Sequence, residues 1–166
     1  MPGDKFSFNK VVGKRSVEAG YKNAAIFSDG QVTDGLGGGI CQVTSTLYNA
    51  AVFANMEIIS RRNHMFVPSY VKGGRDATVV YGSTDFVFEN SRSYPIKILS
   101  SVQNGVANVQ IYGYKNPNEE NYDISIETDL IKSTGTSTVY DAYKVYKQNG
   151  EVIKREKLSR DTYKKY

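Results

Sequence analysis

A glycine cluster followed at once by an amphipathic helix pattern is the feature that most limits how this 166-residue chain can fold. The three glycines Gly37, Gly38 and Gly39 interrupt any regular element. Apolar side chains then recur at intervals of three and four residues, as on one face of a helix: Val43, Leu47, Ala50, Ala51 and Ala54. The spacing predicts one long helix over 40–54, which begins directly after the glycines and ends near Asn55.

The rest of the chain carries strand and turn patterns. Strand-like runs follow the helix at 56–60, 77–81, 85–88, 96–99 and 106–112. Asn104-Gly105 and Asn149-Gly150 are favoured hairpin turns. Before the helix we predict two short strands around a helical turn at 15–19, with a turn at Ser28-Asp29-Gly30. The predicted class is α+β, with one main helix packed against a mostly antiparallel β-sheet that meanders after it.

A polar, turn-rich segment at 115–121 divides the chain into two predicted units. These are a domain at 1–114 and a β-rich C-terminal extension at 115–166, which either continues the sheet or forms a small β unit. Residues 144–166 hold eight basic and three acidic side chains, so the net charge of +4 is concentrated there. A solvated face or a strand edge explains this better than a nucleic-acid surface, and we expect no nucleic-acid partner.

The counts of reactive side chains exclude several classes of protein. One cysteine cannot form an intramolecular disulfide, and one cysteine with one histidine cannot build a structural zinc site. We therefore expect no metal site and no cofactor. The longest apolar stretch, near 50–54, is far shorter than the roughly 20 residues of a membrane helix, and no signal peptide is visible. The early strand pattern suggests that the chain starts inside a longer protein.

Nucleophilic catalysis by a thiol remains open. Cys41 opens the predicted helix, where the helix dipole and unpaired N–H groups stabilise a thiolate. His64 follows the strand that returns from the helix, so its imidazole is a candidate base. Asp76 is the preferred third group, which would orient the imidazole, and Asp85 is the rival. The sequence thus predicts a catalytic set of Cys41, His64 and Asp76.

Each of these residues also has a structural interpretation. Cys41 is equally well explained as a small buried side chain at a tight junction. His64 could simply bond a carbonyl in a polar loop, and either aspartate could cap a turn or pair with Arg75. For substrate binding we assign the residues around the cysteine and the arginine before the aspartate: Gly37, Gly38, Gly39, Gln42 and Arg75. Backbone N–H groups at 39–42 are the candidate oxyanion donors.

Several of these segments together resemble the VanW family. They are 6–13, Gly20-Tyr21, 37–51 with its Gly-Gly-Gly-Ile-Cys-Gln core, His64 and 74–79, with Asp85 and Asn90 further on. The resemblance covers about residues 2–114, and the tail is similar to the stretch that often follows this domain. Cys41, His64 and Asp76 all fall within the motif positions.

The resemblance implies a bacterial cell-envelope protein on the extracellular face of the membrane, associated with vancomycin resistance, in a parent chain that carries a membrane anchor. It implies no established reaction. We therefore expect either a thiol-dependent hydrolase or acyltransferase acting on cell-wall peptide, or a non-catalytic envelope module that binds peptidoglycan, wall polymer or glycopeptide. The arrangement of cysteine and histidine is also similar to that of papain-like and transglutaminase-like enzymes, by analogy alone. The sequence leaves the oligomeric state open.

Overall fold

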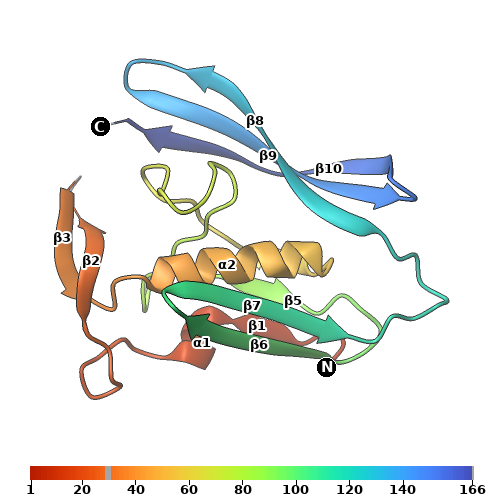
Figure 1. Ribbon diagram of the computed structural model, residues 1–166, viewed down its shortest axis with the longest axis horizontal. Coiled ribbons are helices and arrows are strands. Elements are labelled where there is room, and N and C mark those ends of the chain that lie inside the picture. Colours follow the sequence, from red (N-terminus) through yellow and green to blue (C-terminus); the bar gives the residue numbers. More distant parts are fainter. Residues whose placement is uncertain (29–30, 166) are drawn as a thin grey trace.

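The computed structural model describes residues 1–28 and 31–165 (Figure 1). Asp29 and Gly30 of the expected turn lie outside the described residues. The elements in chain order are β1 (Lys5–Ser7), α1 (Phe8–Val12), β2 (Asn23–Ser28), β3 (Gln31–Leu36), α2 (Ile40–Phe53), β4 (Glu57–Ser60), β5 (Val87–Glu89), β6 (Ile96–Gln103), β7 (Val106–Gly113), β8 (Asp123–Ser133), β9 (Ser137–Gln148) and β10 (Glu151–Lys164). The predicted α+β class, mostly β with one main helix, is confirmed.

Helix α2 matches the predicted helix closely. Gly39 is its N-cap and has a φ of 89°, a left-handed conformation that side chains rarely adopt. The helix-spaced residues Leu47, Tyr48, Ala51 and Val52 are buried, so one face of the helix lies in the core. The glycine cluster therefore sets the point at which the chain turns into the helix.

The helical turn predicted at 15–19 is not where the N-terminal helix forms. The segment 15–19 forms no helix, and a hydrogen-bonded turn closes there when the Gly20 amide donates to the Val17 carbonyl. The short helix is α1, several residues earlier. It forms there because the Ser7 hydroxyl accepts from the Lys10 amide and caps the first turn.

The antiparallel strands are divided among four sheets instead of forming one meander. The sheets are β1-β5-β4, β2-β3, β6-β7 and β10-β9-β8. Both predicted Asn-Gly hairpins are present, with positive φ at Asn104 and Asn149. The strand expected over 77–81 is absent, and this stretch runs as a loop with one isolated bridge between Val80 and Thr84. Its backbone is bonded to other partners, as the site shows.

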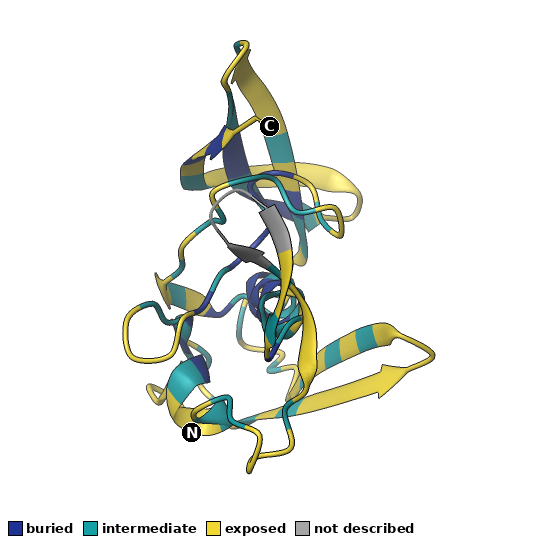
Figure 2. Ribbon diagram, turned by 90° about the vertical axis from the view of Figure 1, so that its left-hand side faces the viewer, coloured by how far each residue is buried: buried dark blue, intermediate teal, exposed yellow. Residues whose placement is uncertain are grey.

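The core lies around α2, which contacts β4, β7 and β8. Figure 2 shows the deepest burial on this helix and on the facing side of the C-terminal sheet, which is formed by β8, β9 and β10. Aromatic and aliphatic side chains from segments far apart in the sequence meet here: Phe8, Met56, Phe86, Phe88 and Ile126. The loop between β4 and β5 runs between α2 and the sheet of β8, β9 and β10 (Figure 1). That loop carries His64 and Asp76.

Candidate active site

Cys41 is the second residue of α2 and is half-buried. Its Sγ lies 3.4 Å from the Thr78 hydroxyl and 3.8 Å from the Val79 carbonyl oxygen. Both partners belong to the loop that was expected to be a strand. The thiol therefore sits at the start of the helix, where N–H groups and the helix dipole favour a negative charge.

Side chains of α2 hold this loop in place. The Ser45 hydroxyl accepts from the Ala77 amide at 2.9 Å and donates to the Ala77 carbonyl at 3.2 Å. One turn further on, the Asn49 amide donates to the Arg75 carbonyl at 2.8 Å. Because side chains of the helix bind the backbone groups of Arg75 and Ala77, this stretch does not pair with a strand. Asp76 is thereby held in place between these two residues.

The segment after β4 brings His64 to Asp76. It runs beside the loop, and the Thr78 amide donates to the Arg62 carbonyl at 2.8 Å. Asp76 Oδ2 lies 2.6 Å from His64 Nδ1 and accepts from the His64 backbone amide at 2.7 Å. The ring is thus oriented by the carboxylate at Nδ1.

The thiol and the imidazole are close enough to shift each other's pKa. Burial raises the pKa of Cys41, but hydrogen bonds to His64 and Thr78 outweigh it, so the thiol pKa lies below its ordinary value of 9.0. Burial alone would lower the pKa of His64, yet its bonds to Asp76 and Cys41 raise that pKa to about 9. Each shift favours the charged form of its group, the thiolate of Cys41 and the imidazolium of His64.

Asp76 is fully buried and accepts hydrogen bonds from three residues. Besides His64, the Arg61 guanidinium donates to Oδ1 at 3.0 Å and the Tyr163 hydroxyl donates to Oδ1 at 2.5 Å. Burial raises the pKa of Asp76, and the bonds from His64, Arg61 and Tyr163 reverse this and lower it. The carboxylate therefore stays charged and fixed.

The C-terminal sheet supplies part of this arrangement. Tyr163, on β10, is completely buried, and its hydroxyl also accepts from the Gly74 amide at 2.7 Å. Asp161, on the same strand, binds the Arg61 guanidinium at 2.6 Å. Arg61 is 6% exposed and bridges two carboxylates, one from each predicted unit. Sequence reasoning missed all three residues, because no local pattern marks a partner 87 to 100 positions away.

Tyr70 is an exposed aromatic residue beside the His64 ring. The Tyr70 hydroxyl lies 3.4 Å from His64 Nε2, and the ring packs edge-on against the imidazole. Burial raises the pKa of Tyr70 to about 12. The phenol is therefore neutral near pH 7 and can act as a hydrogen-bond donor beside the thiol.

The rival aspartate and the arginine are placed elsewhere. Asp85 accepts from the Ser7 hydroxyl and from the Asn9 amide at 2.9 Å, so it caps α1 and does not orient His64. The Arg75 guanidinium donates to the Asn49 side chain and stacks on Phe53. These positions on α2 lie about 12 Å or more along the helix from Cys41. The structure does not bring Arg75 to the thiol.

The glycines differ in their surroundings. Gly37 is buried against Arg15, and a side chain on Gly38 would meet the backbone of Ala24 at 2.6 Å, so these two serve close packing. Gly39 is exposed and faces open space next to Cys41. Gln42 is also exposed. Gly39 and Gln42 are the predicted binding residues that the structure leaves open to a ligand.

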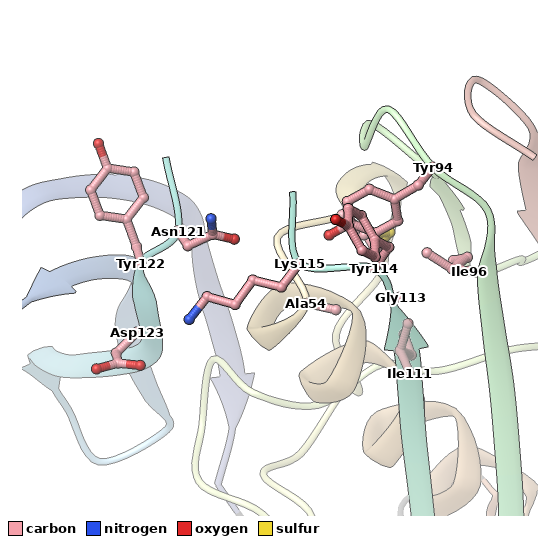
Figure 3. Close-up of a pocket in the computed structure, with 11 residues that line it drawn as sticks. Ala54, Tyr94, Ile96, Ile111, Gly113, Tyr114, Lys115, Asn121, Tyr122 and Asp123 are labelled. Carbon is pink, nitrogen blue, oxygen red and sulfur yellow. The ribbon is translucent and has the colours of Figure 1, made fainter. Parts of the chain in front are cut away.

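Two pockets lie away from the thiol. One, of about 290 Å³, is lined by tyrosines and apolar residues near the end of β7 (Figure 3). The other, of about 620 Å³, lies between α2, β4 and the C-terminal sheet. Neither is lined by Cys41 or His64.

Comparison with known proteins identifies the family. The family model described as VanW like protein matches residues 1–112. The chain belongs to this family. The VanW-like segment is 45% identical over 112 residues to the uncharacterized protein YoaR of Bacillus subtilis (strain 168). It is 26% identical over 122 residues to the vancomycin B-type resistance protein VanW of Enterococcus faecalis (strain ATCC 700802 / V583).

The matches cover only part of the relatives. They include 68% of this chain and 37% of YoaR, and 70% of this chain and 44% of the Enterococcus protein. No solved structure matches the chain. Cys41, His64 and Asp76 all lie inside the VanW-like match, whereas Tyr163 and Asp161 lie beyond it. Within residues 1–28 and 31–165, no helix is long and apolar enough to cross a membrane.

Proposed function

We propose that this VanW-like protein is a thiol-dependent hydrolase or acyltransferase whose nucleophile is Cys41. The observation that carries the proposal is the position of the His64 ring, which lies 2.6 Å from the buried Asp76 carboxylate and is close enough to Cys41 to lower the pKa of its thiol. A nucleophile, a base and an orienting acid in this order are the requirements for acyl transfer.

In the proposed reaction the Cys41 thiolate attacks the acyl carbon of an amide. The C–N bond then breaks, and His64 Nε2 donates its proton to the leaving amine, which leaves a thioester on Cys41. Water or a second amine attacks the thioester and gives its proton to His64, and the thiolate is released. Asp76 stays ionised throughout and holds the ring through Nδ1.

The oxyanion that forms on the substrate needs donors near the thiol. The Ile40 and Gln42 amides already donate to the Gly37 and Gly39 carbonyls, so they do not serve. We assign the Cys41 amide to this role, with the Tyr70 hydroxyl as a second donor from the open side. The sequence predicted backbone N–H groups at 39–42 as oxyanion donors, and of these we propose the Cys41 amide.

The family membership suggests a substrate class for the proposed reaction. We propose cell-wall peptide as the acyl donor and a cell-envelope location, on the extracellular face, for the parent protein. The support is the family membership and the name of the Enterococcus relative, a vancomycin B-type resistance protein. An exposed Gly39 beside the thiol would let an extended peptide approach the backbone closely.

Thiol alkylation tests the site directly, because the chain has a single cysteine and every adduct reports on Cys41. We expect iodoacetamide to react with a titration well below the free-cysteine value of about 8.5 over pH 5 to 9. His64→Ala should return the titration to about that value. Gln42→Ala, an exposed neighbour without contact to His64, is the matched control and should keep the low titration.

A second measurement separates catalysis from binding. Incubation with peptides released from peptidoglycan should give a thioester mass on the wild-type chain, and Cys41→Ala should give none. An ordinary thiol titration with no adduct, together with peptidoglycan binding that survives Cys41→Ala, would favour the alternative, a non-catalytic envelope module.

A further inference from the structure

The larger pocket holds polar groups that the proposed reaction does not use. It encloses about 620 Å³, within the usual range for small-ligand sites, and α2, β4 and the C-terminal sheet form its walls. Five basic and three acidic side chains line it. Its floor includes Arg61, whose guanidinium is already bound to Asp76 and Asp161.

Two deeply buried side chains in this pocket lack protein partners. Lys144 on β9 is 8% exposed and Tyr48 on α2 is 1% exposed. Within the described part of the chain, neither the Lys144 ammonium nor the Tyr48 hydroxyl has a hydrogen bond or an ion pair, and each is in contact with a cation–π partner only. Neither polar atom is fully enclosed, so both can be reached from the pocket, and burial of the side chain lowers the pKa of Lys144.

The carboxylates in the pocket do not satisfy Lys144. Asp161 is paired with Arg61. Glu156 is engaged by Lys154 at 3.2 Å and by the Tyr146 hydroxyl at 3.0 Å. Glu57 is exposed, at the end of β4. Glu156 and Glu57 act on Lys144 only through longer-range attraction. The pocket therefore offers a positive charge that has no close counter-ion and is accessible to a ligand.

We propose that this pocket binds an oxyanion ligand, a carboxylate or a phosphate, with the Lys144 ammonium as its main counter-charge and the Tyr48 hydroxyl as a further donor. The exposed Arg62 at the rim adds a second cation to the entrance. The two walls of the pocket belong to the VanW-like segment and to the C-terminal sheet, so the ligand would join the two parts. The site is separate from Cys41, and the inference does not depend on the proposed reaction.

Ligand titration tests the site. The probes are sodium phosphate for the phosphate source and N-acetylalanine for the peptide-carboxylate source, each against sodium chloride at equal ionic strength. We expect saturable binding by calorimetry and a raised melting temperature with at least one probe, and the probe that binds identifies the source. Lys144→Met removes the charge and keeps most of the side-chain volume, and it should weaken binding at least tenfold.

Lys147→Met is the matched control, because Lys147 lies on the same strand outside the pocket and the substitution makes the same change in charge. It should bind like the wild type. Tyr48→Phe should weaken binding less than Lys144→Met does. The proposal is overturned if neither probe binds the wild-type chain, or if Lys144→Met and Lys147→Met bind equally well.

Discussion

Removing one hydroxyl group on the last strand should disturb the candidate centre from a distance. In Tyr163→Phe the ring stays and two hydrogen bonds are lost, one to Asp76 and one from the Gly74 amide. A bond to a charged group contributes about 1.5–3 kcal/mol, and a buried donor left without a partner costs about 1–3 kcal/mol. Since the two effects overlap, we expect a loss of about 2–4 kcal/mol in the free energy of unfolding.

Urea denaturation measures that loss, and the alkylation titration of Cys41 measures its effect on the site. Tyr140→Phe is the matched control, because Tyr140 packs edge-on against Tyr163 from the neighbouring strand and no hydrogen bond of its hydroxyl is present in the described residues. We expect Tyr163→Phe to move the thiol titration toward about 8.5, and Tyr140→Phe to leave it unchanged.

A purely structural tyrosine would lower stability without moving the thiol titration. The reasoning is refuted if Tyr163→Phe and Tyr140→Phe have the same stability, or if the titration in Tyr163→Phe matches that of the wild type. We expect no neighbouring side chain to replace the lost hydroxyl group, because the Tyr163 hydroxyl is bonded to both Gly74 and Asp76.

Three further predictions concern the same region. The single imidazole should titrate by NMR with a pKa of about 9, so His64 stays protonated at neutral pH. Any reaction that needs its proton should slow above pH 9. In Cys41→Ala, which lacks the sulfur, the pKa of His64 should fall toward 6.5. Arg61→Met should cost about 3–5 kcal/mol in urea, because it leaves two buried carboxylates without their cation, and full stability in that variant would contradict the bridge. Gly38→Ala should destabilise by about 1–3 kcal/mol through overlap with the Ala24 backbone, and an unfolding midpoint equal to that of the wild type would argue against this packing.

The acid side of the pH profile follows from the lowered pKa of Asp76. Its folded pKa lies below the ordinary value of 3.8, so its contribution to stability is present above that value. The contribution is lost as the pH falls through the folded pKa. His64 acts in the opposite sense: its raised pKa adds stability below about 6.5 that is lost as the pH rises toward 9.

Local patterns were enough to predict the elements that local interactions form. The spacing of Leu47 and Ala51 and the two Asn-Gly turns located α2 and both hairpins. Predictions failed where a side chain from another element decides the backbone. The segment at 77–81 has a strand pattern, yet the Ser45 hydroxyl binds the Ala77 backbone and prevents sheet pairing. The start of α1 likewise depends on Ser7 and on a distant carboxylate, Asp85.

The same distinction applies to the site. Residue types and position relative to the helix pointed to Cys41, His64 and Asp76, and the structure brings these three side chains together. Their catalytic role stays a prediction. Arg61 and Tyr163 could not be found in this way, because their importance arises only from the partners they meet across the fold.

The bond between Tyr163 and Asp76 also bears on when the site comes into existence. These residues are 87 positions apart, and β10 ends only at Lys164. Contacts of such long range form late, after the entropy of closing the intervening chain has been overcome, and a chain made on the ribosome completes β10 well after α2. Cys41 would thus remain an ordinary thiol in the growing polypeptide, and its reactivity would appear only when β10 docks.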